Sequence, residues 1–121
     1  MSQLIVYHYP KCSTCRNAVK WLKEQGHDLE LRHIVEQTPG VDELSELVAA
    51  SGLELKKFFN TSGEVYKREN LKEKLPNLSE REQLELLAGE GKLIKRPIVK
   101  LGDKVTVGFK EDDFCRIWEN E

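Results

Sequence analysis

The sequence predicts an α/β fold in which a β-α-β unit and a later β-β-α unit are separated by a helical insert. Three observations support this prediction. A strand, a helix and a second strand fit within the first 35 residues, and a polar region with helical patterns follows. Two further strand patterns and an amphipathic helix then complete the chain. Because 121 residues suffice for one ordinary domain, residues 1–121 are predicted to form one domain with an insert at about 41–91.

The first unit is predicted from three consecutive patterns. Residues 3–9 are rich in β-branched and aromatic side chains and end at Pro10, which predicts a strand. The next segment has the i, i+3, i+4, i+7 stripe of an amphipathic helix, with Gly26 as its stop; the stripe is Cys15, Ala18, Val19 and Leu22. Residues 29–35 alternate as a second strand would. This β-α-β order favours parallel strands with a right-handed crossover.

The insert is predicted to consist of short helices. Residues 41–52 and 53–60 predict two helices that separate at Ser51-Gly52, and residues 64–75 predict a third that ends at Pro76. Ser79 followed by Glu82 matches a capping box, which begins a helix that continues through about residue 88. Gly89 and Gly91 are predicted to close it.

The last unit contains a hairpin and a helix. Residues 98–101 and 104–109 are strand patterns joined by Gly102-Asp103, a two-residue hairpin signal. Residues 111–119 place three apolar side chains on one helical face, namely Phe114, Ile117 and Trp118. The complete order is that of a thioredoxin-like fold with an inserted helical subdomain.

Charge and hydropathy limit the partners and the location. The net charge is −2, so we expect no direct contact with nucleic acid. No segment approaches the roughly 20 apolar residues of a membrane span, and the N-terminal apolar run is too short for a signal peptide. We therefore expect a cytoplasmic protein without membrane association. The sequence carries no signal for the oligomeric state, so a monomer is the default expectation. Thiols in that compartment are kept reduced, so three cysteines do not indicate a disulfide scaffold.

Two residues separate Cys12 from Cys15 in the sequence. This Cys-x-x-Cys spacing suits a structural disulfide, half of a metal site or a redox pair. A structural zinc site needs four ligands. The remaining candidates lack the spacing of partner ligands, so no metal is expected; they are His8, His27, His33 and Cys115.

The position of Cys12 favours redox chemistry over two inert core thiols. Cys15 lies on the apolar stripe, whereas Cys12 precedes the helix, where first-turn amides carry partial positive charge. Such a position lowers a thiol pKa, and Lys11 and Arg16 add positive charge. We therefore predict that Cys12 attacks and a half-buried Cys15 resolves. Cys115 is predicted to be a semi-buried structural thiol.

Two sequence motifs and a weaker third resemble those of one superfamily. Residues 7–17, Tyr-His-Tyr-Pro-Lys-Cys-Ser-Thr-Cys-Arg-Asn, resemble the signature of the ArsC/Spx superfamily. That superfamily includes glutaredoxin-coupled arsenate reductases, Spx/MgsR regulators and YffB-like thiol proteins. Residues 93–98, Leu-Ile-Lys-Arg-Pro-Ile, are similar to its Arg-Pro segment before the hairpin, and residues 108–111 are similar to its turn into the last helix. The resemblance covers essentially the whole chain.

The resemblance implies roles for five residues. Cys12 would be the nucleophile, and Arg16 would hold an oxyanion or stabilise the thiolate. His8 would lie close to that sulfur, and Arg96 would point at the site. Pro97 would be a cis-proline beside the cysteines, a geometry that is rare for an arbitrary X-Pro bond.

The chain also departs from the arsenate reductase pattern, which uses several arginines to bind a tetrahedral oxyanion. YffB-like relatives have arginine where this chain has Ser62, and a further arginine is expected where it has Phe109. The cations that could substitute are Lys67, Arg68 and Lys110. Arsenate reductases also commonly lack the second cysteine. These departures favour dithiol exchange over arsenate reduction.

The sequence therefore predicts a thiol-disulfide oxidoreductase with no bound cofactor. Its partners would be a disulfide substrate and a thiol reductant, either glutathione, glutaredoxin or thioredoxin. One alternative is a glutathione- and glutaredoxin-coupled arsenate reductase. Another is an Spx-like redox-sensing regulator that binds RNA polymerase, with which Cys-x-x-Cys and Ser51-Gly52 are compatible. The absence of a longer polar tail after Trp118 argues against that regulator.

Overall fold

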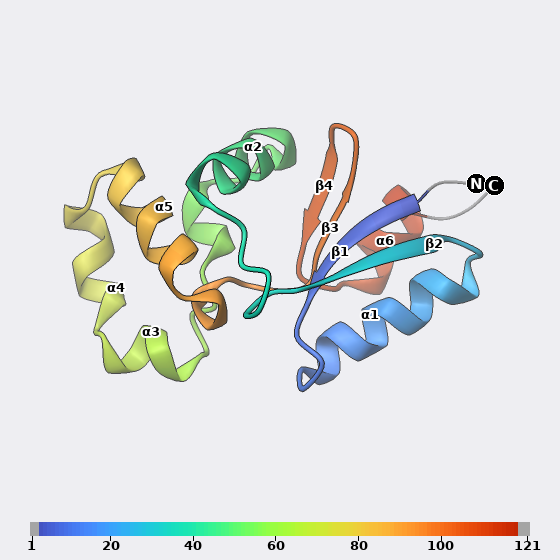
Figure 1. Cartoon of the computed structure of the whole chain (residues 1–121), viewed down its shortest axis with the longest axis horizontal. Helices are drawn as coiled ribbons and strands as arrows, with labels where there is room; N and C mark the ends of the chain where they lie inside the picture. The colour runs from blue at the N-terminus through green and yellow to red at the C-terminus, as the bar shows by residue number, and fades with distance from the viewer. Residues whose placement is uncertain (1–2, 119–121) are drawn as a thin grey trace.

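The structure, a computed structural model, describes residues 3–118 (Figure 1). The first unit consists of β1 (Gln3–His8), α1 (Ser13–Glu24) and β2 (Asp28–His33). The insert contains four α-helices: α2 (Val41–Ser51), α3 (Glu64–Arg68), α4 (Leu71–Lys74) and α5 (Glu80–Gly89). The last unit consists of β3 (Ile98–Leu101), β4 (Lys104–Val107) and α6 (Glu111–Trp118). The predicted α/β class and element order are confirmed.

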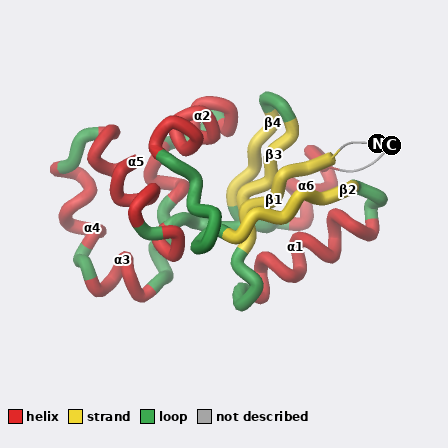
Figure 2. The backbone as a smooth tube through the Cα atoms, in the orientation of Figure 1, coloured by secondary structure: helices red, strands yellow, loops and turns green. Residues whose placement is uncertain are grey.

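The four strands form one mixed sheet in the order β2-β1-β3-β4 (Figure 2). β1 pairs in parallel with β2, and Leu4 lies opposite Leu29. β1 pairs antiparallel with β3, which forms a hairpin with β4 through the predicted Gly102-Asp103 turn. A parallel pair followed by an antiparallel hairpin is the predicted thioredoxin-like arrangement.

Helices α1 and α6 cover one face of the sheet. Their buried side chains form one apolar cluster with β1 and β3: Leu4, Val6, Ala18, Leu22, Val99, Phe114 and Trp118. The alternation along β1 explains this choice of face, because Leu4 and Val6 point to one side and Tyr7 points to the other. The predicted apolar stripes of both helices therefore face the sheet.

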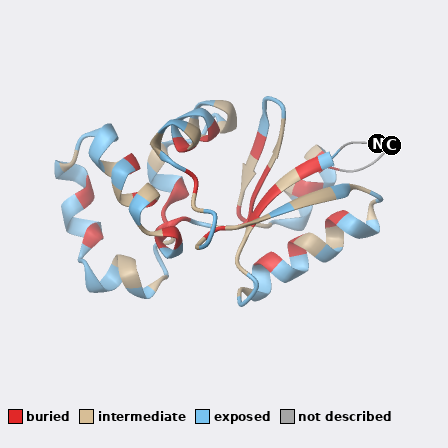
Figure 3. Cartoon of the chain, viewed as in Figure 1, coloured by how far each residue is buried: buried red, intermediate tan, exposed pale blue. Residues whose placement is uncertain are grey.

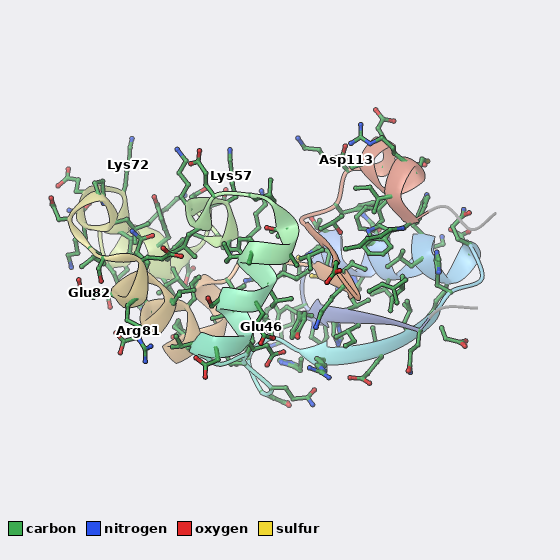
Figure 4. The ribbon with its side chains drawn as sticks, turned by 90° about the horizontal axis from the view of Figure 1, so that it is seen from above. Glu46, Lys57, Lys72, Arg81, Glu82 and Asp113 are labelled. Carbon is green, nitrogen blue, oxygen red and sulfur yellow. The ribbon has the colours of Figure 1, made fainter. Side chains whose placement is uncertain are left out.

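The insert packs against the opposite face and extends away from the sheet (Figure 3). Tyr7, Ile98 and Val105 of the sheet belong to the same buried cluster as Leu44 and Leu47 of α2. The outer side of the insert is polar, and the labelled side chains of Lys57, Lys72, Arg81 and Glu82 project outward in Figure 4.

A polar network also joins the insert to the sheet. The Tyr7 hydroxyl donates to the Glu43 carboxylate of α2, and Arg32 of β2 pairs with that carboxylate at 3.2 Å. Burial and the Glu43 carboxylate raise the pKa of Tyr7, because both disfavour a phenolate there. Tyr7 therefore remains a hydrogen-bond donor to the insert.

The predicted capping box forms at the start of α5. Ser79 Oγ accepts from the Glu82 amide at 3.1 Å, and Glu82 Oε1 accepts from the Ser79 amide at 3.0 Å. The hydrogen bonds from Ser79 lower the pKa of the Glu82 carboxyl because they favour its charged form. This local motif needs no distant contact, so the sequence identifies the start of α5.

Two helical predictions in the insert are wrong in detail. The single helix predicted for 64–75 is divided into α3 and α4, because Asn70 adopts a left-handed conformation with φ of 52°. Pro76 then lies inside a 3₁₀ turn, Leu75–Asn77, rather than just after a helix. The helix predicted for 53–60 is only a 3₁₀ turn, Leu55–Phe58.

Three strands end earlier than predicted. β1 ends at His8 rather than at residue 9. β2 stops at His33, because the amides of Val35 and Glu36 donate to His33 Nδ1 at 3.1 Å. These hydrogen bonds stabilise a turn of the chain after His33. β4 stops at Val107, because Gly108 has a φ of 82° and donates its amide to the Pro97 carbonyl at 2.8 Å. The predicted last helix agrees through residue 118, and its end at residue 119 lies outside the described residues. Within residues 3–118, no helix is long and apolar enough to cross a membrane.

Candidate active site

Cys12 lies at the start of α1, directly after the turn that follows β1. Its amide donates to the Tyr9 carbonyl at 2.9 Å, and its own carbonyl accepts from the Arg16 amide at 3.1 Å. Cys12 is thus the N-cap residue, with extended backbone angles of −92° and 119°. The amides of the first helical turn lack partners within the helix and carry partial positive charge, so they can stabilise an anion there.

The surroundings of Cys12 favour its thiolate. Burial raises the pKa of Cys12, but hydrogen bonds from the backbone and thiol of Cys15, the Arg96 charge and the Thr14 amide lower it by more. The pKa of Cys12 therefore lies below the ordinary thiol value, in the direction that the sequence predicts. The cation that contributes is Arg96, which is distant in sequence.

Cys15 is a different kind of thiol. Its side chain is 1% exposed rather than half-buried as predicted, because it faces the sheet with the rest of the α1 stripe. The Tyr9 amide donates to Cys15 Sγ at 3.5 Å. Burial raises the pKa of Cys15 to about 12, and its hydrogen bond to Cys12 and the Cys12 charge act in the same direction. The two sulfurs thus share a hydrogen bond and differ strongly in acidity.

Cys12 opens into a cleft of about 330 Å³ where segments from distant parts of the chain meet. The cleft is lined by Cys12, Thr14, Asn60, Ser62, Lys95, Arg96, Val107, Gly108, Phe109 and Lys110. Phe59 and Ile94 form an antiparallel bridge, and the Asn60 amide donates to the Leu93 carbonyl at 2.8 Å. These bonds place the 60–62 loop beside the segment that carries Arg96.

The Arg96-Pro97 peptide bond is cis, as the family resemblance implies. Arg96 Nη1 donates to the carbonyls of Lys92 at 3.0 Å and Ile94 at 3.3 Å. Its guanidinium carbon lies 5.0 Å from the centre of the Tyr9 ring. Arg96 therefore lies at the cleft with an ordered side chain, rather than extending freely into solvent.

The other predicted site residues lie around the same turn. The His8 and His33 rings are 6.2 Å apart, and burial followed by the His33 charge lowers the pKa of His8. Lys11 is exposed, and Arg16 Nη1 donates to the Pro10 carbonyl at 3.1 Å. The predicted actions of His8, Lys11 and Arg16 on the Cys12 sulfur stay predictions.

The two positions where arginine was expected do face the cleft. Ser62 and Phe109 both line it. Among the predicted substitutes, Lys110 lines this cleft, whereas Arg68 lines a separate apolar pocket in the insert. The cleft thus contains cations beside the Cys12 thiol, but it has serine and phenylalanine at the two positions where arginine was expected.

Cys115 is exposed, so its predicted semi-buried position is wrong. It follows Phe114, and one residue along a helix turns the side chain by about 100°. The apolar face of Phe114 and Trp118 is directed into the core, and Cys115 is directed away from it.

Sequence reasoning overlooked Lys95, Asn60 and Tyr9 as site residues. Lys95 is adjacent to Arg96 in the motif at residues 93–98, so the sequence could have indicated that it also lies at the cleft. Asn60 reaches the cleft through the bridge to the 93–95 segment, which no local pattern reveals. Tyr9 has a strand pattern, and its contact with Arg96 depends on the tertiary fold.

The fold and the cleft define a thioredoxin-like protein with a Cys-x-x-Cys sequence at the start of its first helix. The family model described as "ArsC family" matches residues 7–117. The chain therefore belongs to the ArsC family, within the ArsC/Spx superfamily that the motifs resemble.

The comparisons include both close and distant relatives. The "Uncharacterized protein YusI" of Bacillus subtilis is 60% identical over 95% of this chain and 98% of its own length. A crystal structure of an ArsC family related protein from Bacteroides fragilis is 48% identical, covers 93% of this chain and 95% of that chain, and superposes with a TM-score of 0.90. The regulatory protein MgsR of Bacillus subtilis is 29% identical over 95% of this chain and 90% of its own.

Proteins with two kinds of function are thus among the relatives. An arsenate reductase of Escherichia coli is 29% identical over 82% of this chain and 69% of its own. MgsR, by contrast, is named as a regulatory protein. Within residues 3–118, no group of three or more metal-binding side chains gathers to form a metal site.

Proposed function

We propose that this protein is a cytoplasmic thiol-disulfide oxidoreductase in which Cys12 is the nucleophile and Cys15 the resolving thiol. The Cys12 thiolate attacks one sulfur of a substrate disulfide, which forms a mixed disulfide and releases the other sulfur as a thiolate. Cys15 loses its proton and attacks the Cys12 sulfur, which releases the second substrate thiol. The substrate gains two electrons, and the protein retains a Cys12–Cys15 disulfide that glutathione, glutaredoxin or thioredoxin would reduce.

The observation that carries this proposal is the difference in acidity between two hydrogen-bonded sulfurs. Cys12 has a lowered pKa in an open cleft, and Cys15 has a pKa raised to about 12 behind it. An accessible thiolate can begin exchange, whereas a buried thiol is protected until a mixed disulfide forms. Once Cys12 is bonded to substrate, its negative charge no longer raises the pKa of Cys15, so the second attack becomes easier.

We expect alkylation by iodoacetamide to distinguish the two cysteines. The alkylation rate of Cys12 should rise at a lower pH than the alkylation rate of an ordinary thiol does, because the pKa of Cys12 is lowered. At neutral pH, Cys12 should react at least about tenfold faster than Cys15. Mass spectrometry of peptides after short exposure would measure both rates. Preferential labelling of Cys15 would reject the assignment.

Arsenate reduction is the enzymatic alternative, and the names of several relatives favour testing it. Ser62 and Phe109 leave the cleft with fewer arginines than a tetrahedral oxyanion would use. We therefore expect marginal arsenate turnover with glutathione and glutaredoxin.

Ser62→Arg should increase apparent arsenate affinity by about tenfold, because it adds a charged donor to the cleft. Position 62 suits this test because Ser62 is exposed, whereas the Phe109 ring packs on Phe114 at 4.7 Å. Ser62→Gln is the control for side-chain length without charge. Rapid arsenate turnover by the unsubstituted protein would contradict the preference for dithiol exchange.

A redox-sensing regulator is the non-enzymatic alternative, because MgsR is similar over most of the chain. In that case, oxidation of the same cysteine pair would alter binding to RNA polymerase. Co-purification with the polymerase under reducing and oxidising conditions separates this function from catalysis. Redox-dependent binding without exchange activity would favour the regulator.

A further inference from the structure

The backbone of Tyr9 contacts both cysteines. Its carbonyl accepts from the Cys12 amide at 2.9 Å, and its amide donates to Cys15 Sγ at 3.5 Å. The turn between β1 and α1 therefore fixes Tyr9 beside the sulfur pair. Because these bonds use only backbone atoms of Tyr9, they leave its ring available for another contact.

The Tyr9 ring contacts both Arg96 and His33. The guanidinium carbon of Arg96 is 5.0 Å from the ring centre, which is within cation–π range. The His33 ring makes a T-shaped contact with Tyr9 at 5.7 Å and 89°. His33 is itself held by two backbone amides that donate to its Nδ1. The Tyr9 ring thus packs on an ordered neighbour while it contacts the cation.

The hydrogen bonds of Arg96 hold only part of its guanidinium, so the orientation of the group also depends on its contact with the Tyr9 ring. Nη1 donates to two carbonyls, those of Lys92 and Ile94. Nε is buried and has no hydrogen-bond partner among the described residues. A planar group held through one terminal nitrogen can still rotate, and the face of an aromatic ring opposes that rotation.

We propose that Tyr9 is a positioning residue whose ring holds the Arg96 guanidinium at the cleft beside the Cys12 sulfur. This inference rests on the proposed function, because it concerns the attacking thiol of that reaction. Arg96 is one of the groups that lower the pKa of Cys12. The other charged groups that line the cleft are Lys95 and Lys110. The buried Cys15 thiol interacts with Cys12, and His33 contacts the Tyr9 ring.

Replacement of the ring should weaken the effect of Arg96 on Cys12. Tyr9→Leu should raise the apparent pKa of Cys12 and slow its alkylation at neutral pH by about two- to fivefold, the effect of losing one cation–π contact. Tyr9→Phe retains the ring and should keep the wild-type rate and pH profile. Thermal unfolding would check that both variants fold, and Tyr9→Met replaces Tyr9→Leu if leucine prevents folding.

A double-mutant cycle separates positioning from a general disturbance of the turn. In an Arg96→Gln protein, Tyr9→Leu should have no further effect on the Cys12 profile. In a Lys95→Gln protein, which loses a neighbouring cation instead, Tyr9→Leu should keep its full effect. The inference would be overturned if Tyr9→Leu shifted the apparent pKa of Cys12 equally with and without Arg96, or if Tyr9→Leu alone caused no shift.

The same measurements distinguish failure of the inference from failure of the proposed function. An ordinary thiol pKa for Cys12 in the unsubstituted protein would overturn both, because no stabilised thiolate would exist. A low pKa that Tyr9→Leu leaves unchanged would overturn only the role of Tyr9.

Discussion

Cys12→Ser is expected to abolish disulfide exchange, with a loss of at least about a thousandfold in the exchange rate. A serine hydroxyl remains protonated at neutral pH, so the helix amides and Arg96 would have no thiolate to stabilise. Turnover of a model disulfide substrate with a thiol reductant would measure the loss.

Cys115→Ser is the matched control for this substitution. Cys115 is exposed on α6 and is outside the lining of the cleft, so its replacement should leave the exchange rate within about twofold of the wild-type value. The proposed function would be wrong if exchange persisted without Cys12. It would also be wrong if Cys115→Ser caused the larger loss.

Gly91→Ala is expected to destabilise the protein by about 3 kcal/mol or more, or to prevent folding. A Cβ added at Gly91 would lie 2.2 Å from the Ile34 carbonyl oxygen and 2.9 Å from Val35 Cα. Both atoms belong to the backbone, so no side-chain rotation can relieve the contact. Gly91 is buried where the chain leaves the insert toward Arg96, and the close approach joins it to the turn after β2.

Gly89→Ala is the control for Gly91→Ala, because a Cβ added there would have no described atom within 4 Å apart from its chain neighbours and the backbone of its own helix. Gly89 is the last residue of α5, where alanine should be neutral or slightly stabilising. Denaturant unfolding of the three proteins would compare their free energies of unfolding. Equal stability of Gly91→Ala and the wild-type protein would contradict the tight contact with Ile34.

The parts of the fold that the sequence predicted correctly are encoded by local signals. The capping box of Ser79 and Glu82 and the Gly102-Asp103 hairpin each depend on a few adjacent residues. The division between α3 and α4 has a weaker signal, because asparagine is only one of the residues that tolerate the left-handed conformation of Asn70. The early end of β2 depends on the His33 ring, whose acceptor role is not evident from strand periodicity.

The candidate site shows the same division between local and distant effects. The helix-start position of Cys12 follows directly from sequence, and so does the apolar position of Cys15. The residues next to Cys12 suggested Lys11 and Arg16 as sources of positive charge, and the family resemblance added Arg96, whose charge lowers the pKa of Cys12. That residue reaches the cleft through the 93–97 segment, so its contact with Tyr9 could be found only in the folded structure.

The most direct test of Cys12 attack and Cys15 resolution is mass spectrometry of Cys15→Ser after reaction with a disulfide substrate. Removing the resolving thiol leaves the attacking sulfur in place, so the mixed disulfide should accumulate on Cys12. The unsubstituted protein should instead form an intramolecular Cys12–Cys15 disulfide and release both substrate thiols. Adducts found chiefly on Cys115, or no adduct on Cys12, would contradict the proposed reaction.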